Sequence, residues 1–568
     1  MITRRTFLAA ASGLVLAGDA PPPQGTVLLP PPSGGDDTGV LNAALHRGTG
    51  GLVRGAPGAN YRVSAPLVVP TGTTLIMSGC TVTLAAGSAC NLLTNTAVAE
   101  GGRDRDITVI GGTWVRASGV GGTGPDLHTL RWRRVDGLTL KGLTVQTASD
   151  KYAISLGDVI DTTVTEIKFA VHSDGVHIQG PAVRTRISGI RGSTGDDTIA
   201  ITPRDWQAYD DVSGSVTDTV IEDVDVASLA ALVKVLGGSP DTTASRTTIR
   251  GVTGLAGNNV IWIGDDTADW RTTGGRVDDL IVEHIAAGTL PGRGGMVHIN
   301  GSAVGRVQLR GLRVQGPRGR EPLVRVVPFR PATLAGLTVE DVVVEQLDAA
   351  PLLLVARTAT IGQLLVSGVT VAGTSAGTAV AQVAGVVDDL TVRAVSLTAS
   401  GDSYLVELPG WATHATVRRA SVSDVQIAGR GGALVTAPAA THVLPRLAVN
   451  QSRTVGTPWL VDLNTTTELT VSNVAIDNTT GGVARVRNSG AAVVRGDGLR
   501  FARGARGAAV AAGGSLVSYA LDLAVDVSEL VRADGSRATN TNAALSCGTG
   551  PVECTGLTWQ HLRTGATW

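Results

Sequence analysis

A short motif, apolar-x-x-apolar, recurs along most of this chain and constrains its fold more than any other feature. It occurs as LKGLTV (140–145), VTEIKF (164–169), ISGIRG (187–192), IEDVDV (221–226) and IRGVTG (249–254), and it continues as far as VSNVAI (471–476). Successive copies are mostly about 23 to 34 residues apart. This period is expected of a solenoid, in which each coil stacks on its neighbours.

A second pattern, apolar-x-apolar, precedes the copies of the first. Examples are Val176-His177-Ile178, Ile199-Ala200-Ile201 and Val233-Lys234-Val235. Alternation with period two, in segments rich in Val, Ile and Thr, indicates strands and not helices. The flanking aliphatic residues should point into the coil and the middle residue outward. The sequence therefore predicts an all-β fold, a single-stranded right-handed parallel β-helix with a continuous aliphatic interior.

The N-terminal part divides into an export signal and a cap. Residues 1–20 (MITRRTFLAAASGLVLAGDA) place Arg4 and Arg5 before an apolar run too short to span a bilayer, which is typical of a twin-arginine signal. An ordinary secretory signal and a buried N-terminal segment are the alternatives. The stretch GGDDTGVLNAALHRG (34–48) predicts a short amphipathic helix with Asp36 or Asp37 as its N-cap. Such a helix would cover the open end of the solenoid.

These patterns predict four segments. Residues 1–20 are an export signal, 21–60 an N-terminal segment with the capping helix, 61–510 the parallel β-helix, and 511–568 a C-terminal cap or small appended module. We therefore expect a bacterial protein that is secreted, either periplasmic or extracellular. Oligomeric state is not fixed by the sequence, and a monomer and a homotrimer both remain open.

Composition excludes several classes of function. The formal net charge is −1, so there is no general basic surface for nucleic acid. No later apolar run is long enough to span a membrane. The cysteines form two close pairs, Cys80 with Cys90 and Cys547 with Cys554, and each pair could be a local disulfide. No histidine lies beside either pair at zinc-ligand spacing, so we expect no metal and no cofactor.

Acidic residues mark one region of the predicted solenoid. Asp174 lies three residues before outward His177, and Asp197 lies three residues before outward Ala200. The two aspartates should therefore occupy equivalent turns on adjacent coils, about 4.8 Å apart, with Asp196 to one side. Like charges at that distance raise at least one pKa, which a general acid near neutral pH requires. The alternative to a catalytic role is that these Asp residues only cap turns. An acid needed only for the turn would be expected to recur, but the matching positions on other coils are Tyr152, Ala231, Asn259 and Gly295.

The outward positions near these acids resemble a sugar site. The predicted ladder of outward residues is Arg131, Ser155, His177, Ala200, Lys234, Trp262, His298 and Arg325. Trp206 and Tyr209 belong to an inserted loop at about 203–216 that could wall a cleft and stack on a sugar ring. We expect His177, Lys234, Trp206 and Trp262 to contact the substrate. The pair Asp265 and Asp266 follows Trp262 and is predicted to form a turn.

The sequence resembles a known superfamily. DDTGVLNAAL, followed by YRV and PLVVPTG, is similar to the opening of pectin-lyase-like β-helices, and HSDGVHI and GDDTIAI resemble two motifs of the polygalacturonase-like glycoside hydrolases of family 28. The resemblance implies that Asp196 protonates the leaving oxygen, that Asp174 and Asp197 activate water, and that the anomeric configuration is inverted. The family's Gly-His-Gly motif has no counterpart, and Leu232-Val233-Lys234 only partly matches its Arg-Ile-Lys motif.

The expected function is that of an exported glycoside hydrolase acting on a polysaccharide, with acidic or deoxy sugars favoured. Two alternatives belong to other classes. The first is a carbohydrate-binding β-helix of the tailspike or adhesin type, with little or no catalysis. The second is a polysaccharide lyase or epimerase, which would abstract a proton with a Lys, Arg or His base, often helped by Ca²⁺.

Overall fold

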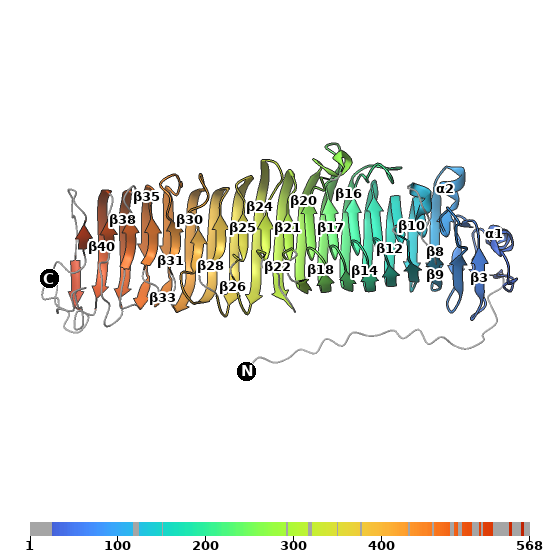
Figure 1. Cartoon of the computed structure of the whole chain (residues 1–568), viewed down its shortest axis with the longest axis horizontal. Coiled ribbons are helices and arrows are strands. Elements are labelled where there is room, and N and C mark those ends of the chain that lie inside the picture. The colour runs from blue at the N-terminus through green and yellow to red at the C-terminus, as the bar shows by residue number, and fades with distance from the viewer. Residues whose placement is uncertain are drawn as a thin grey trace.

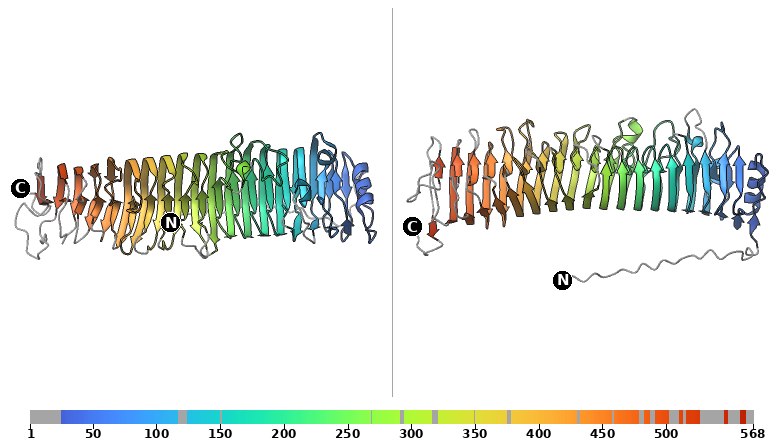
Figure 2. Two further views of the ribbon diagram at one scale, coloured as in Figure 1. Left: turned by 45° about the horizontal axis from the view of Figure 1, so that its top comes forward. Right: turned by 60° about the horizontal axis from the view of Figure 1, so that its bottom comes forward.

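The computed structural model is an all-β parallel solenoid with few helices (Figure 1). It describes residues 25–116, 124–149, 151–267, 269–290, 294–315, 321–348, 350–374, 378–429, 432–456 and 459–477, and beyond these only the backbone of strands. Two further views show the strands of successive coils aligned in rows along the long axis (Figure 2). The prediction of a parallel β-helix is confirmed.

A row of short strands runs along one side of the solenoid. It comprises β4 (Leu67–Val69), β7 (Leu93–Asn95), β13 (Val176–Gln179), β15 (Ile199–Thr202), β17 (Val233–Leu236), β19 (Ile261–Gly264), β21 (Val297–Ile299), β23 (Val324–Val326), β25 (Leu353–Val355), β27 (Ala379–Val383), β29 (Tyr404–Glu407), β31 (Ala433–Ala437), β34 (Trp459–Leu463), β37 (Gly482–Val486), β39 (Val510–Ala512) and β41 (Leu545–Cys547). The beginnings of two long strands complete the row between β7 and β13.

Long, bent strands form the rest of most coils. They are β8 (Asp104–Ile110), β10 (Leu130–Lys141), β12 (Ile154–Val171), β14 (Ala182–Thr194), β16 (Val216–Ser228), β18 (Thr243–Ala256), β20 (Arg276–Thr289), β22 (Ala303–Val314), β24 (Ala332–Val344), β26 (Ala359–Val371), β28 (Val386–Ala399), β30 (Thr416–Gly429), β38 (Ala491–Phe501) and β40 (Ser515–Val525).

Shorter pieces take the place of the long strands near both ends. They are β1 (Val27–Leu28), β2 (Leu52–Arg54), β3 (Asn60–Val63), β5 (Thr74–Ile76), β6 (Thr81–Leu84), β9 (Thr113–Arg116), β11 (Thr144–Thr147), β32 (Arg446–Asn450), β33 (Arg453–Val455), β35 (Thr467–Ser472), β36 (Ala475–Asp477) and β42 (Thr558–His561). The helices are α1 (Thr38–Arg47), α2 (Thr96–Glu100) and 3₁₀ turns at Pro125–Leu127 and Trp270–Thr272.

The recurring apolar-x-x-apolar motif forms a corner of each coil. Its third residue adopts the left-handed conformation, with φ from 54° to 66° in eight successive coils, at Glu166, Gly189, Asp223, Gly251, His284, Gly311, Asp341 and Gly368. Glycine takes this conformation without cost, and Asp tolerates it better than most residues. The two apolar residues around the corner then both point inward, as Ile221 and Val224 do in β16. The motif is therefore the sequence signature of a bend inside a continuous strand.

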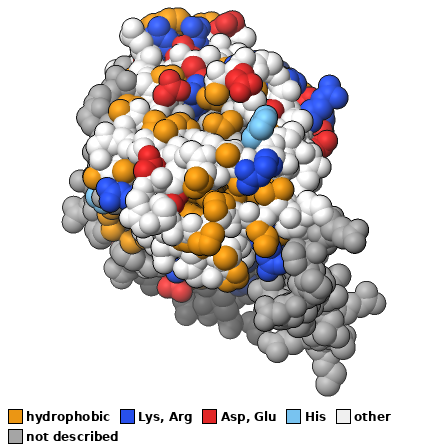
Figure 3. All heavy atoms as spheres, turned by 90° about the vertical axis from the view of Figure 1, so that its right-hand side faces the viewer, with side chains coloured by type: hydrophobic (Ala, Val, Ile, Leu, Met, Phe, Trp, Pro, Cys, Tyr) orange, Lys and Arg blue, Asp and Glu red, His pale blue; other side chains and the backbone are white. Residues whose placement is uncertain are grey.

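The N-terminal helix is present at Thr38–Arg47 and packs against β1 and β4. Asp37 is its N-cap residue, but its carboxylate accepts hydrogen bonds from the backbone N–H groups of Ser33 and Arg62. Asp36 instead accepts the N–H of Thr38. Viewed from this end, apolar side chains are mixed with basic and acidic ones (Figure 3). That α1 protects the edge of the first coil stays a prediction.

The disulfide prediction is wrong for the first cysteine pair, because Cys80 and Cys90 are both free thiols. Cys80 is buried and its Sγ lies 3.1 Å from the carbonyl oxygen of Ala56, whereas the Sγ of Cys90 lies 3.7 Å from that of Ser64. Each thiol is thus directed to a different neighbouring segment, and burial raises the pKa of both. Side chains of the second pair, Cys547 and Cys554, lie outside the described residues.

The sheet extends past both boundaries expected from the sequence. Strands β1 to β3 begin before residue 61, and β40 to β42 pair in parallel beyond residue 510. The division into four segments stays a prediction. Within the described residues, no helix is long and apolar enough to cross a membrane.

Because the interior is aliphatic, substitutions at inward and outward positions of one strand should differ greatly in their effect on the free energy of unfolding. Replacing buried Ile221 by alanine should lower the free energy of unfolding by about 2–5 kcal/mol, because it leaves a cavity in a stacked core. Asp225→Ala, an exposed change in the same strand, should have an effect within about 0.5 kcal/mol. Urea unfolding followed by circular dichroism checks this, and equal midpoints for the two variants would contradict it.

Candidate active site

The outward ladder predicted from the sequence is confirmed residue by residue. Parallel pairing aligns each member with the next through eight coils: Arg131, Ser155, His177, Ala200, Lys234, Trp262, His298 and Arg325. Most of this ladder is nevertheless covered. His177 is completely buried, and Lys234 is only 6% exposed.

The inserted loop 203–216 accounts for this burial. Its Asp211 carboxylate accepts hydrogen bonds from the guanidinium groups of Arg131 and Arg133, the latter at 3.0 Å from Nη2. Asp210 of the same loop pairs with Arg204 and Arg271. These ion pairs clamp the loop onto the ladder, so that Trp206 and Tyr209 lie over it.

The three aspartates converge on one point. Carboxylate oxygens of Asp174, Asp196 and Asp197 all lie within 4.8 Å of one another. Asp174 and Asp197 are each 3% exposed, whereas Asp196 is open to solvent. The backbone N–H of Gly175 donates to the carbonyl oxygen of Asp197 at 3.0 Å, so the stacking of adjacent coils sets the distance between these turns. The hydroxyl groups of Thr194 and Ser228 donate to the Asp196 carbonyl and fix its backbone.

Asp174 has a buried cationic partner. Nδ1 of His177 lies 2.6 Å from Oδ2 of Asp174, and Nε2 lies 3.3 Å from Oδ2 of Asp205. Burial alone would lower the pKa of His177, but the charges of Asp205 and Asp174 and their hydrogen bonds raise it to about 9. The imidazole is therefore protonated at neutral pH. Burial raises the pKa of Asp174, and the hydrogen bond from His177 opposes that rise.

Asp205 was not anticipated from the sequence, although it is the most connected acid of the region. It is fully buried and accepts hydrogen bonds from the Tyr152 hydroxyl at 3.1 Å, from the Gln179 amide and from the backbone N–H of Trp206. Tyr152 also stacks on His177, with ring centroids 3.9 Å apart. The only sequence signal for Asp205 is its place in the inserted loop, directly before Trp206.

Asp197 has a different cationic partner. Nζ of Lys234 lies 3.1 Å from Oδ2 of Asp197 and 3.0 Å from Oδ2 of Asp266. It also lies 4.7 Å from the ring centroid of Trp262 and 5.1 Å from that of Trp206. Burial alone would lower the pKa of Lys234, but the charges of Asp197 and Asp266 raise it. Lys234 is thus an internal counter-ion, held between two carboxylates and two indole rings.

The second acidic pair lies in the turn after β19, but only Asp265 has the structural role that was predicted. The carboxylate of Asp265 accepts the backbone N–H groups of Gly274 and Ser302, which is a turn role. Asp266 instead pairs with Lys234, because the turn after β19 folds back over the ladder.

Asp196 differs from its neighbours because no cation of the described residues pairs with it. Desolvation by the surrounding atoms, followed by the negative charges of Asp174 and Asp197, raises the pKa of its carboxyl to about 7. Water reaches this side chain and screens part of that repulsion. Among the three carboxyls, Asp196 is therefore the one that can carry a proton near neutral pH and remain accessible.

Three carboxylates at this spacing can in general hold a cation, and within the described residues no other group of three acidic, cysteine or histidine side chains does so. Here two cations of the protein already contact the cluster. The ammonium of Lys234 lies on Asp197, and the imidazolium of His177 lies on Asp174.

Several solved structures are similar to this chain. The family 28 exopolygalacturonase of Yersinia enterocolitica matches with a TM-score of 0.33 and 13% identity, over 78% of this chain and 75% of that one. A tailspike protein of E. coli bacteriophage HK620 matches with a TM-score of 0.41 and 12% identity, over 80% and 78%. The GH87 alpha-1,3-glucanase of Streptomyces thermodiastaticus matches with a TM-score of 0.27 and 14% identity, over 89% and 71%.

No family model matches the sequence, and no curated protein matches it significantly. The strand pairings by themselves define a parallel β-helix. The similarities to solved structures leave the family and the activity open.

The pKa of His177 tests the buried arrangement directly. In the wild type its imidazole should titrate near pH 9, so the stabilisation it provides is complete below about pH 6.5 and is lost as the pH rises through 9. In Asp205→Asn the pKa should fall, because burial then acts with one anion fewer. Asp210→Asn, in the same loop but paired only with arginines, should leave it unchanged.

Nuclear magnetic resonance of histidine-labelled protein measures this titration, with His177→Gln to assign the signal. A wild-type pKa below 7, or the same value in Asp205→Asn, would contradict the arrangement.

Proposed function

We propose that this protein is an exported glycoside hydrolase that cleaves a polysaccharide, with Asp196 as the proton donor and Asp174 and Asp197 as the pair that activates water. One observation carries the proposal: three convergent carboxyls lie in unequal electrostatic environments. Two of them have buried cationic partners, and among the described residues no cation pairs with the third. Carboxyls in surroundings this different can divide the acid and base roles of hydrolysis between them.

Asp196 suits the role of general acid. With a pKa of about 7 it holds its proton at mildly acidic and neutral pH, and it is exposed to the solvent from which a substrate arrives. Proton donation to the glycosidic oxygen leaves Asp196 negative. The neighbouring cations Lys234 and His177 would lessen the cost of that third negative charge.

Asp174 and Asp197 suit the role of base. A water molecule that donates to two oxygens at about 2.8 Å each spans about 4.6 Å between them, given tetrahedral geometry. The carboxylate oxygens of this cluster lie within 4.8 Å of one another, so one water can contact two of them. His177 and Lys234 contact these two carboxylates and fix their orientation. His177 is buried behind Asp174, so we propose that it positions the base and does not contact the sugar.

Substrate contacts at the acids would come from the half-buried rings of Trp206 and Trp262. Lys234 lies between them and is already paired with Asp197 and Asp266, so we do not assign to it the binding of a substrate carboxylate. This differs from the role expected of Lys234 from the sequence and makes plain polygalacturonate a weaker candidate than a less charged polymer.

A lyase or epimerase fits the site less well. Such enzymes need an unprotonated base, and the two candidates, His177 and Lys234, both have raised pKa values and acidic partners. A polysaccharide-binding protein without catalysis is favoured by one observation: Asp174 and Asp197 are each only 3% exposed. Export rests on the pattern around Arg4 and Arg5, which lies outside the described residues.

Replacing the proton donor should abolish most of the activity. We expect Asp196→Asn to release reducing ends from a polysaccharide panel about 10²- to 10⁴-fold more slowly than the wild type, because amides do not donate the required proton. Asp225→Asn, an exposed change one strand away, is the matched control and should behave like the wild type. A wild type that binds a polymer but releases no reducing ends would favour the binding alternative, and new ultraviolet absorbance would favour a lyase.

The pH dependence of activity should follow Asp196. Because the acid must be protonated, kcat should fall as the pH rises through about 7. A profile of initial rates between pH 4 and pH 9 checks this. An activity that rises steadily to pH 9 would assign the proton donor elsewhere.

We expect inversion of configuration, as the resemblance of GDDTIAI to the family 28 motif implies. The nearest oxygens of the cluster lie within 4.8 Å, which is shorter than the about 6.5–9.5 Å between carboxyl groups of typical inverting enzymes. The distance therefore does not itself support inversion. Proton nuclear magnetic resonance of the first anomer released decides, and a product with the configuration of the substrate would overturn this expectation.

A further inference from the structure

We propose that the polysaccharide-binding surface extends along the solenoid axis, far beyond the three acids, with Phe329 and Trp411 as platforms on which sugar rings of an extended chain stack. The proposal rests on the proposed function in that the same polymer occupies both places. The proposed ligand is a polysaccharide whose sugar rings have apolar faces. No catalysis takes place at Phe329 or Trp411.

Among the described residues, the few strongly exposed aromatic side chains lie in turns that follow the short strands, and we call this line of turns the ridge. Within the described residues, the aromatic side chains more than half exposed are Trp270 at 58%, Phe329 at 58% and Trp411 at 55%. Each follows a short strand: Trp270 follows β19, Phe329 follows β23 and Trp411 follows β29. Because consecutive coils are in register, the turns after these strands lie in one row beside the outward ladder.

The row places the platforms at increasing distances from the acids. β23 lies four coils beyond β15, which Asp197 precedes, and β29 lies seven coils beyond it. At about 4.8 Å per coil, Phe329 is about 19 Å and Trp411 about 34 Å along the axis from the acids. A monosaccharide or disaccharide bound at the acids is too short to reach Trp411. Only a polymer can use both places together.

The ring of Trp411 is held in place. The guanidinium of Arg357, two coils earlier, lies 5.6 Å from its ring centroid. A ring fixed before binding loses little conformational entropy when a sugar stacks on it. Trp270 differs because two guanidinium groups already contact its ring. Those of Arg204 and Arg271 lie 4.8 Å and 4.5 Å from the ring centroid. For that reason we assign the platforms to Phe329 and Trp411.

Polar groups lie on the ladder beside the platforms. Arg325 is paired with Glu321 at 3.1 Å, and the Gln382 amide donates to Glu407 at 2.8 Å. These half-buried groups can exchange hydrogen bonds with sugar hydroxyls while the rings cover the apolar faces. Such a combination of stacking and hydrogen-bonding groups suits a polysaccharide.

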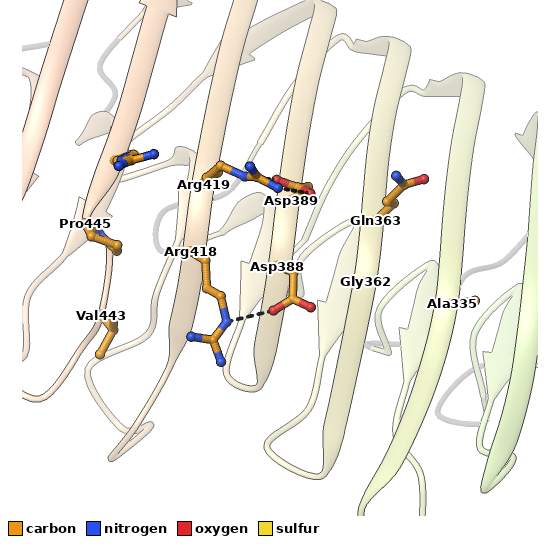
Figure 4. A pocket seen from close by; sticks show the side chains of 10 residues that line it. Ala335, Gly362, Gln363, Asp388, Asp389, Arg418, Arg419, Val443 and Pro445 are labelled. Carbon is orange, nitrogen blue, oxygen red and sulfur yellow. Dashed lines mark hydrogen bonds and ion pairs between the residues drawn. The ribbon is translucent and has the colours of Figure 1, made fainter.

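A second surface offers a contrasting chemistry. A hollow of about 810 Å³, with Asp388, Asp389, Arg418 and Arg419 among its lining residues, lies near the beginnings of β24, β26, β28 and β30. Figure 4 shows Arg418 and Arg419 directed toward Asp388 and Asp389, with which they pair. Recognition of a polyanion there would depend strongly on salt, whereas stacking on Phe329 and Trp411 would not. Salt dependence therefore separates the two surfaces.

Affinity electrophoresis tests the platforms without requiring hydrolysis. The full-length protein is run through gels that contain polygalacturonate, rhamnogalacturonan or dextran, and the retardation gives a Kd. We expect retardation by at least one polymer, retained at high salt. Trp411→Leu and Phe329→Leu should each raise that Kd about 2- to 12-fold, the range for loss of one aromatic stack. Trp411→Phe, which keeps a ring, should stay within about twofold of the wild type.

Controls separate this proposal from hydrolysis. Val343→Ala, an exposed apolar change on a long strand, should leave the Kd unchanged. Short oligosaccharides of the retarding polymer should be cleaved equally by the wild type and the platform variants. Retardation without cleavage in the wild type would end the hydrolase proposal and leave this one standing.

Three results would overturn the proposal. The first is a wild type that no gel retards, and the second is a Phe329→Leu/Trp411→Leu double variant that binds as the wild type does. The third is binding that disappears at high salt, which would point to the arginine-lined hollow. Circular dichroism of each variant confirms the fold, and exposed positions are not expected to disturb it.

Discussion

Backbone hydrogen bonding between parallel coils is the constraint on which the rest of this structure depends. It fixes the rise per coil at about 4.8 Å, and it brings residues 23 positions apart, such as Asp174 and Asp197, onto neighbouring turns. The same register lines up the outward ladder and the ridge of exposed aromatic rings. Distances at the candidate site are therefore set by the fold, and loops decide only what covers it.

The three aspartates of the site differ in the charged groups that contact them. Asp174 faces an imidazolium that Asp205 keeps protonated, and Asp197 faces an ammonium shared with Asp266. Asp196 is exposed and lies beside both of these carboxyls. Three identical side chains in one cluster thus have different electrostatic surroundings.

The fold and the positions of several site residues could be predicted from the sequence, because side chains of a strand alternate with a period of two and the coils of a solenoid have a nearly constant length. Those two rules placed Lys234 and Trp262 on the ladder and Asp174 next to Asp197. They could not place Asp205 or Asp266, which belong to turns of irregular length after a short strand. Nor could they show that His177 and Lys234, although directed outward from the coil, are covered by a loop.

The loop 203–216 has a consequence for how such a site can arise and change. One insertion into one coil brings Asp205, Trp206, Tyr209 and Asp211 together. It therefore supplies the anion beside His177, one of the two rings beside Lys234 and the carboxylate that binds Arg131 and Arg133. Loss or exchange of that single segment would alter ionisation, cover and ring stacking in the same step. The solenoid provides a regular scaffold, and a single inserted loop provides several groups of the site together.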